Sequence, residues 1–302
     1  MPRRAWIGMG VIAAASLLAW PAWSAARSRL SASAAPRAPL ALLPESLQQR
    51  PPRPDFGDGR LRVCADPNNL PWSNARGEGF ENRIAQLLAR DLALELEYTW
   101  WPQRRGFIRQ TLNANRCDLV MGVPASYELT LRTRPYYRSA YVFVTRRGVH
   151  VRSLDDPALR HMRIGLHVMG DDYNNSPAEQ SLVRRGLQRN VVGYSIYGDY
   201  SRPNPPEALV HAVATGAVDV AIVWGPLAGY FAGREGAPLA LSPVTPTVDL
   251  PFIPYVYDIA IGLRHGDSTR RAVLDAELRR RAPEISAILA SYGVPRVGPP
   301  GD

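Results

Sequence analysis

Two periods of hydrophobic spacing alternate along the chain from about residue 60 onward. In 61–65 apolar residues alternate with others, which predicts a short strand, and in 80–91 they recur every three or four positions, which predicts a helix. The same analysis predicts a strand over 94–100, a helix from about 104 to 113 and an apolar strand over 118–123. This β-α-β-α-β order requires parallel strands joined by right-handed crossovers.

A second β-α-β-α-β set follows between about residues 160 and 235. Its first helix has a strong start signal, because Ser176 is a good cap, Pro177 fits the first turn and Glu179 stands three residues after the cap. In the first set, the apolar strand over 118–123 suits a sheet that is covered on both faces. The prediction from residue 141 onward comprises strands over 141–145, 162–167, 191–197, 219–224 and 256–263, and helices beginning at 176, 204, 226, 268 and 284.

The two sets predict an α/β fold of two lobes, each a mainly parallel sheet flanked by helices. A late return strand and terminal helices require the chain to cross between the lobes twice, at 133–139 and 250–257. Two crossings make a hinge, and the cleft between the lobes is then the default binding site. The predicted division is a signal peptide over 1–26, a linker over 27–59, a first lobe over 60–140 and 255–295, a second lobe over 141–254, and a tail over 296–302.

The N-terminus predicts export. Arg3 and Arg4 precede an apolar stretch over 6–20, and small residues at 22–26 suit cleavage by a signal peptidase. The apolar stretch is short and rich in alanine, so we expect no stable membrane insertion and a soluble periplasmic protein. The segment 27–59, rich in proline, alanine and arginine, is typical of an extended linker.

The charge of the chain is basic throughout. The formal net charge is +9 over 302 residues, and every basic residue other than histidine is arginine. These arginines are scattered singly and in pairs, without the basic run and interleaved aromatics that a nucleic-acid groove needs, so we predict no nucleic-acid partner. A basic surface that faces an acidic protein is the better use of this charge.

The cysteines and histidines exclude a metal site on sequence grounds. Cys64 and Cys117 both lie in the exported part, and an even count in an oxidising compartment favours a disulfide over two buried thiols. The five histidines are dispersed and form no ligand pair, and no serine sits in a nucleophile elbow. We therefore predict no metal, no cofactor and no catalytic residue.

The stretch LRVCADPNNLPWS ends the first strand in a polar loop. Pro67 and Pro71 exclude both helix and strand there, and α/β proteins bind ligands in such loops at strand ends. Loops after the other strands add aromatic and amide side chains, which suit sugars, flat ligands or an inserted protein segment. The residues predicted to line the cleft are Asp66, Asn68, Asn69, Trp72, Trp101, Gln103, Arg104, Ser126, Tyr127, Asp171, Asp172 and Trp224.

Some residues near this cleft keep two interpretations. Trp100 suits core packing as well as the cleft. Arg104 begins a predicted helix, where positive charge is unfavourable, so it either contacts an anion or is one of a solvated pair of arginines. His167 ends a strand near the cleft and is either a base or, more commonly, a satisfied structural histidine. Asp171 and Asp172 supply too few oxygens for calcium and are interpreted as turn residues.

The order of these segments resembles periplasmic solute-binding proteins of type II, family 3, over most of 60–295. The finer resemblance is to the solute-binding-like proteins associated with PQQ-dependent quinoprotein dehydrogenases, the MoxJ/XoxJ type of methanol oxidation systems. The segments that carry this resemblance are LRVCADPNNLPWSNARGEGFENRIA, EYTWWPQRRGFIRQTL, PYYRSAYVF, VDVAIVWGPLAGYF and ILASYGVP. The resemblance implies the two-lobe type II periplasmic binding-protein fold.

The departures from amino-acid binders in that class are informative. In those binders an arginine after the third strand takes the ligand carboxylate, and an aspartate in the second lobe takes the ammonium group. Here Leu129 stands at the first place and Trp224 at the second, five residues after Asp219. Asp171 and Asp172 follow Gly170, where the binders usually present an anion site. We therefore expect that ordinary amino acids are not the ligand.

The resemblance implies a non-catalytic accessory protein of a quinoprotein dehydrogenase, acting in its binding, maturation or activation. The predicted partner is a periplasmic PQQ dehydrogenase, with a small molecule as the other occupant of the cleft. The alternative is a substrate-binding protein of an ABC importer for an uncharged or aromatic solute. An enzyme on this scaffold, such as a dehydratase, is a third class.

Overall fold

The computed structural model describes residues 56–168, 176–196 and 203–298. The predicted signal peptide, most of the predicted linker, and Asp171 and Asp172 lie outside the described residues. The strands are β1 (Arg60–Ala65), β2 (Asn68–Asn69), β3 (Ser73–Asn74), β4 (Glu95–Trp100), β5 (Leu119–Pro124), β6 (Leu131–Arg132), β7 (Tyr137–Arg146), β8 (Ile164–Val168), β9 (Val191–Ser195), β10 (Val220–Trp224), β11 (Leu239–Pro243), β12 (Val248–Asp249), β13 (Ile253–Pro254) and β14 (Val256–Leu263).

None of the helices in the described part of the chain is long and apolar enough to cross a membrane. The α-helices are α2 (Phe80–Asp91), α3 (Phe107–Gln110), α4 (Pro177–Arg184), α5 (Glu207–Ala214), α6 (Gly225–Ala232), α7 (Ser268–Arg280) and α8 (Ala282–Ser291), with short 3-10 turns η2 (Phe56–Asp58), η3 (Pro157–His161) and η5 (Gln188–Asn190).

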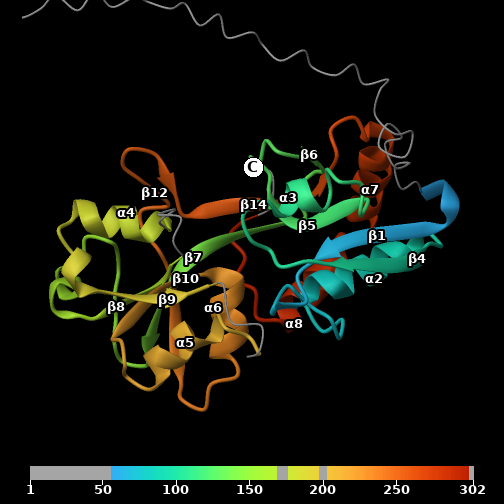
Figure 1. Ribbon diagram of the computed structural model, residues 1–302. Helices are drawn as coiled ribbons and strands as arrows, with labels where there is room; N and C mark the ends of the chain where they lie inside the picture. The colour runs from blue at the N-terminus through green and yellow to red at the C-terminus, as the bar shows by residue number, and fades with distance from the viewer. Residues whose placement is uncertain (1–55, 169–175, 197–202, 299–302) are drawn as a thin grey trace, which may run out of the picture. The chain divides into compact units, whose positions relative to one another are not determined.

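Ten strands form one sheet with the order β4-β1-β5-β14-β7-β10-β8-β9, and β6 and β11 pair at its sides. On one flank β4, β1 and β5 run parallel, and on the other β10, β8 and β9 run parallel. Between these flanks, β14 and β7 pair in antiparallel fashion. Figure 1 shows the two halves, with α2, α3, α7 and α8 around one and α4, α5 and α6 around the other.

The long strands β7 and β14 join the two halves of the sheet. The first part of β7 pairs with β14, from Tyr137 opposite Ile259 to Ala140 opposite Val256. The remainder of β7 pairs with β10 and β11 in the other half. The segment 250–252, expected to be part of the second crossing, instead forms the turn between β12 and β13. Proline explains this difference, since Pro251 and Pro254 interrupt a continuous ladder.

Each half has its own apolar core. In the first half α2 packs Ile84 and Leu88 against the sheet, as its hydrophobic spacing predicts. Phe80 opens this helix and lies edge-on to Tyr137, with ring centroids 5.9 Å apart. Gly79 precedes the helix, and a Cβ there would lie 2.0 Å from the Trp72 carbonyl oxygen. Only glycine therefore lets the LPW loop lie this close to the start of α2.

Several short elements differ from the prediction. In the loop where Pro67 and Pro71 were expected to exclude a strand, β2 and β3 form a short antiparallel ladder, because the prolines flank the paired positions and do not occupy them. The helix expected over 104–113 reduces to α3, because Gly106 before it has a φ of +84° and Thr111 after it leaves helical geometry. The end of the predicted linker is part of the fold, since η2 carries Phe56 onto the first core. The Arg270 guanidinium lies 5.1 Å from the centre of the Phe56 ring. Phe56 therefore anchors the first described residues to the core of the first half.

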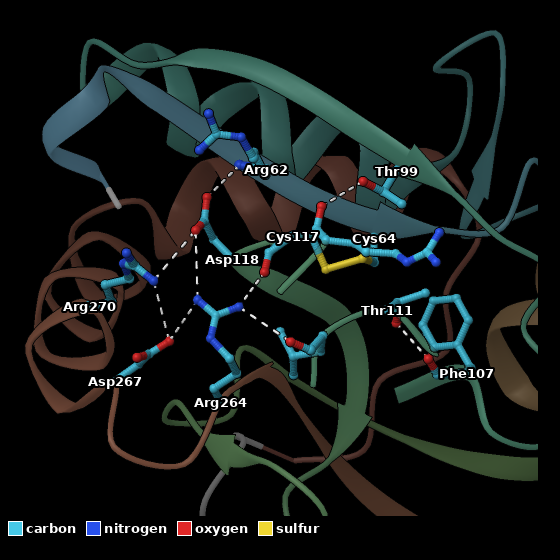
Figure 2. The surroundings of a disulfide bond; sticks show 12 residues. Arg62, Cys64, Thr99, Phe107, Thr111, Cys117, Asp118, Arg264, Asp267 and Arg270 are labelled. Atoms are coloured by element: carbon cyan, nitrogen blue, oxygen red, sulfur yellow. Dashed lines mark hydrogen bonds and ion pairs between the residues drawn. A yellow bond between two sulfur atoms is a disulfide. The ribbon is translucent and has the colours of Figure 1, made fainter. Parts of the chain in front are cut away.

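Cys64 and Cys117 form a disulfide, as predicted, with Cα atoms 5.6 Å apart. Figure 2 shows it between Cys64 on β1 and Cys117, two residues before β5 begins, and β1 and β5 already pair. Both cysteines are buried in a small apolar cluster that includes Phe107 and Leu112. The disulfide therefore links β1 to the segment that enters β5, beside the α3 region.

We expect that replacing Cys64 and Cys117 together by alanine lowers the free energy of unfolding by about 2–4 kcal/mol. The bond closes a loop across a sequence separation of 53 residues, and its loss widens the unfolded ensemble. Urea unfolding of the oxidised protein and of the double variant measures this. A reductant should destabilise the native protein and leave the variant unchanged. Equal stability of the two proteins would contradict the prediction.

Candidate functional site

A cavity of about 300 Å³ is lined by side chains from both halves of the sheet. We call it the central cavity. Trp72 and Glu81 reach it from the first half, and His167 and Trp224 reach it from the second. Its residues lie on or beside the ends of β1, β5, β8 and β10, where parallel strands present their loops. The strands that connect the halves also contribute, through Tyr137, Tyr141 and Ile259.

Asp66 holds the loop between β1 and α2 in place. Its carboxylate accepts hydrogen bonds from the backbone N–H of Asn68 at 2.8 Å and of Gln103 at 2.6 Å. The Asn69 side chain donates to the Gln103 side chain at 3.0 Å, which joins the same two loops again. The Ser73 hydroxyl donates to the Asp66 carbonyl at 2.8 Å. Two proline-rich loops are therefore ordered around one carboxylate.

A hydrogen bond also connects the two halves beside the cavity. The backbone N–H of Asn204 donates to the Asn68 side-chain oxygen at 3.2 Å. Asn204 has a φ of +49°, a conformation that asparagine tolerates better than most residues. One neutral hydrogen bond of this kind contributes about 1 kcal/mol, so it adds little to the cohesion of the two halves.

The aromatic rings around the cavity pack in tilted and edge-to-face pairs. Tyr141 and Trp224 have ring centroids 5.3 Å apart, and Tyr257 lies 5.7 Å from Trp224. On the opposite side Trp72 lies 6.4 Å from Phe80, which supports it from the core. Trp72 and Trp224 are both half-buried in this structure. Partly exposed rings with fixed neighbours bury large areas on binding at a small cost in side-chain entropy.

Glu81 is a buried carboxyl at the start of α2 that faces the central cavity. It is 8% exposed, and the Tyr136 hydroxyl approaches its Oε1 at 3.5 Å. Burial raises the pKa of Glu81 to about 8, so the side chain is largely protonated at neutral pH. Gly122 on β5 makes room for it, since a Cβ there would lie 2.1 Å from Glu81 Oε1.

His167 faces the cavity from the end of β8 and is 8% exposed. Its Nε2 lies 3.1 Å from the Pro206 carbonyl oxygen. Because a carbonyl can only accept, Nε2 carries the hydrogen and donates it. Burial lowers the pKa of His167 to about 4, so the ring is neutral at physiological pH. This geometry agrees with the structural interpretation of His167.

The structure brings half of the predicted cleft residues to the central cavity. Trp101, by contrast, packs beside the disulfide cluster with the Arg116 guanidinium 5.0 Å from its ring. Arg104 and Ser126 are exposed, and Tyr127 packs on the same disulfide cluster. These four are outside the cavity lining, and their contact with a partner stays a prediction. The six that line it are Asp66, Asn68, Asn69, Trp72, Gln103 and Trp224.

Trp100 and Leu129 also have definite places. Trp100 stacks on Tyr98 with ring centroids 4.5 Å apart, so its aromatic face is used within β4. Leu129, which occupies the arginine place of the amino-acid binders, is 59% exposed and does not face the cavity. No group of three or more possible metal ligands occurs among the described residues.

Glu81 is the most important lining residue absent from the prediction. The helical period could have indicated it, because Glu81 falls three and four residues before Ile84 and Ala85, on the buried face of α2. An acid in the first turn of a helix suits the helix dipole, and that position made it inconspicuous. Tyr137 and Tyr141 also line the cavity and were not predicted. They lie four residues apart on β7, and only the structure shows that this face of the strand borders the cavity.

The chain is 31% identical to protein MoxJ of Methylorubrum extorquens over 291 residues, which cover 91% of this chain and 93% of MoxJ. The chain belongs to the MoxJ family. The crystal structure of periplasmic binding protein XoxJ from Methylobacterium extorquens AM1 is similar, with a TM-score of 0.65 and 34% identity over 79% of this chain and 99% of XoxJ. The crystal structure of MxaJ from Methylophaga aminisulfidivorans MPT gives a TM-score of 0.69 and 28% identity over 78% of this chain and 100% of MxaJ.

These similarities confirm the predicted family and the two-lobe type II periplasmic binding-protein fold. No protein-family model matches the chain. The central cavity of this protein lies where the two halves of the sheet meet. A binding protein uses that position because hinge motion there opens and closes the site.

Proposed function

We propose that this MoxJ-family protein is an exported, periplasmic, non-catalytic binding protein that acts as an accessory to a PQQ-dependent methanol or alcohol dehydrogenase. The observation that carries the proposal is the 31% identity to MoxJ across nearly the whole of both chains. The similarity to periplasmic binding protein XoxJ supports the location and the binding role. The accessory protein would serve the dehydrogenase in its binding, maturation or activation.

The hinge supports a clamping mechanism. Only β7 and β14 pass between the flanks of the sheet in the described part of the chain, and they pair at the midpoint. Rotation about these two strands would separate Trp72 from Trp224 and break the hydrogen bond from Asn204 to Asn68. Closing on a segment of the dehydrogenase or on a small ligand would bury the aromatic walls again.

An exposed apolar turn supports a protein partner. In the turn between β12 and β13, Leu250 is 74% exposed and Phe252 is 90% exposed. Asp249 anchors this turn, since its carboxylate accepts hydrogen bonds from Arg184 and Arg185 at 2.7 Å each. Apolar side chains held outward by a buried ion pair are typical of a protein contact.

A pull-down tests the proposal directly. We expect the mature protein to capture a quinoprotein dehydrogenase from periplasmic extract of its own host, identified by PQQ-dependent alcohol oxidation in the bound fraction. Replacing both Leu250 and Phe252 by serine should reduce the captured activity at least tenfold without lowering the melting temperature. Val192→Ser, which alters a 37% exposed residue on β9, is the matched control and should not reduce it.

The alternative is an importer subunit that delivers an uncharged or aromatic solute. The observation that favours it is the central cavity of about 300 Å³, which is large enough for a small solute. In that case a metabolite would bind tightly, no quinoprotein would be captured, and deletion of the gene would leave alcohol oxidation intact. Loss of alcohol oxidation in the deletion strain, with unimpaired uptake, would decide for the accessory role.

A further inference from the structure

We propose that the central cavity selects a small organic cation without a carboxylate, such as a substituted ammonium ion or a cationic side chain on a partner segment. The cation would lie between the aromatic walls with its charge toward Glu81. This inference rests on the binding role proposed above and names the ligand chemistry of the same cavity. Three observations support it: the charge of the residues that line the cavity, the few hydrogen bonds that the Glu81 carboxyl receives, and the aromatic walls.

The cavity has the opposite charge character to the rest of the protein. The chain carries 36 arginines and a formal net charge of +9. Among the described residues that line the cavity, however, there are two acids, Asp66 and Glu81, and no arginine. A ligand carboxylate or phosphate would find no cationic partner on these residues, whereas a ligand cation would meet the Asp66 carboxylate and, once its proton is released, that of Glu81.

The two acids differ in what they have left to offer a ligand. Asp66 accepts two backbone N–H groups, from Asn68 and Gln103, and its position is fixed by them. Glu81 receives only the long contact from the Tyr136 hydroxyl at 3.5 Å among its described hydrogen bonds. A carboxylate has about four acceptor sites, so most of the capacity of Glu81 remains for a ligand. An ammonium group would supply the missing donors and charge.

The aromatic residues complete a cation site. Tyr137, Tyr141, Trp72 and Trp224 all line the cavity with Glu81. Aromatic faces attract cations within about 6 Å of the ring centre, and the attraction is stronger where water is excluded. The same rings give apolar contact to alkyl groups on the nitrogen. A compact alkylammonium ion therefore matches both the walls and the cavity of about 300 Å³.

The protonation of Glu81 predicts how binding depends on pH. Burial raises the pKa of Glu81 to about 8, and a bound cation favours the ionised form. Below that pKa, binding must release the Glu81 proton, so the affinity for a cation should rise by about tenfold for each unit of pH up to about 8 and then level off. An uncharged ligand of the same shape should show no such rise.

Calorimetric titration tests the proposal with named probes. We would titrate the mature protein with choline, tetramethylammonium and benzyltrimethylammonium chlorides, and with the uncharged isosteres in which carbon replaces nitrogen, between about pH 6 and about pH 9. We expect at least one cation to bind at least tenfold more tightly than its isostere, with the pH dependence given above. Isosteres that bind as well as the cations, or no binding by any of the three cations, would overturn the proposal.

Variants separate the charge from the fold. Glu81→Gln should weaken cation binding by about a hundredfold at pH 8 and abolish its pH dependence, while the melting temperature does not fall. Glu95→Gln, the matched loss of one exposed carboxylate on β4, should bind as the native protein does. Trp224→Leu should lower the affinity for a cation more than it lowers the affinity for the uncharged isostere of that cation. Unchanged cation binding by Glu81→Gln would overturn the proposal.

The outcome is independent of the dehydrogenase test. If the pull-down captures the quinoprotein while the cations fail to bind, the accessory role stands and the cation inference is wrong. If a cation binds with the expected pH dependence and no quinoprotein is captured, the ligand class stands and the accessory role is wrong. Each proposal therefore has its own failing result.

Discussion

Replacing Asp118 by alanine is expected to lower the free energy of unfolding by about 3–5 kcal/mol. Asp118 is fully buried at the start of β5, and its carboxylate accepts the backbone N–H of Arg62 at 2.8 Å. Its Oδ1 lies 3.4 Å from Arg270 Nη1 and 3.9 Å from Arg264 Nη2. Removing the carboxylate leaves buried guanidinium groups with less compensating charge, which is among the costliest changes in a protein interior.

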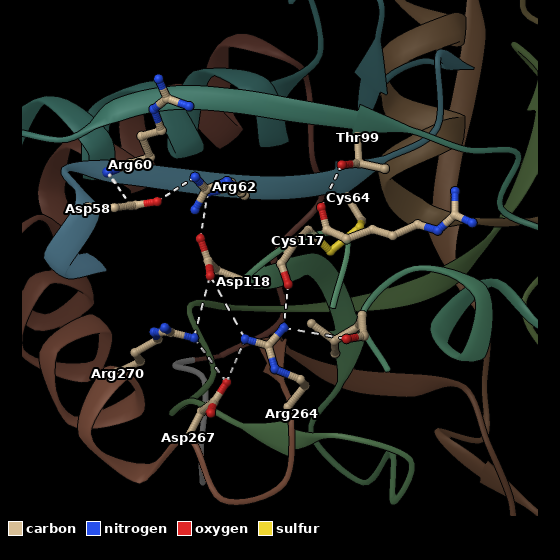
Figure 3. A network of polar contacts seen from close by, with 12 residues as sticks. Asp58, Arg60, Arg62, Cys64, Thr99, Cys117, Asp118, Arg264, Asp267 and Arg270 are labelled. Carbon is tan, nitrogen blue, oxygen red and sulfur yellow. Dashed lines mark hydrogen bonds and ion pairs between the residues drawn. A yellow bond between two sulfur atoms is a disulfide. The ribbon is translucent and has the colours of Figure 1, made fainter. Parts of the chain in front are cut away.

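The network around Asp118 explains why the cost should be large. Figure 3 shows Arg264 and Arg270 reaching Asp118 from the same side as Asp267. The Arg264 side chain is 5% exposed, lies 3.1 Å from Asp267, and also donates to the Cys117 carbonyl oxygen. The group thus joins β1, β5 and the start of α7 next to the disulfide. One carboxylate holds three segments that are distant in sequence.

Urea unfolding of three variants measures the Asp118 effect. Asp118→Asn keeps an acceptor for the Arg62 N–H and loses the charge, so it should be less destabilising than Asp118→Ala. Asp58→Asn is the control, because Asp58 contacts the same Arg62 from a solvent-exposed position and its loss should change little. A native-like midpoint for Asp118→Ala would show that the ion pairs only break even with their desolvation.

Much of the fold could be predicted because its signals are local. The helix predicted over 80–91 is α2, with the same limits, and Ser176 does cap α4, where its hydroxyl accepts the Glu179 N–H. The strand predicted over 256–263 is β14. These elements follow from hydrophobic period and capping chemistry, which depend on neighbours within one or two turns.

The parts that could not be predicted depend on distant partners. Asp118 and Arg264 come together only when β14 has crossed back to the first half, and no local pattern marks them as a pair. Trp101 follows β4 immediately, yet its ring packs toward Arg116 and not toward the cavity, because the turn after a strand releases side chains from the strand's alternation. Hydrophobic periodicity therefore predicts which way a side chain points within a helix or strand, but not within a loop.

The Glu81 environment is expected to make the protein less stable as pH rises from about 4.5 to about 8. The pKa of Glu81 is raised from 4.5 to about 8 by burial. Between those values the folded protein holds a proton on Glu81 that the unfolded chain has released. Because the folded state binds more protons there, each unit of pH costs it about 1.4 kcal/mol.

Glu81→Gln removes this linkage and should be stabilising by a few kcal/mol at pH 8, where native Glu81 must either keep its proton or ionise in a buried site. Near pH 4 this gain in stability of the variant over the native protein should vanish, because Glu81 is then mostly protonated in both the folded and the unfolded chain. Measuring the difference between variant and native unfolding free energies at each pH cancels the other titrating groups. A difference that stays constant from pH 4 to pH 8 would show that Glu81 has an ordinary pKa, and Glu95→Gln should give such a flat line. If the difference between variant and native protein grows with pH, this protein retains a destabilising acid at the wall of its cavity. A purely structural role does not explain such a residue.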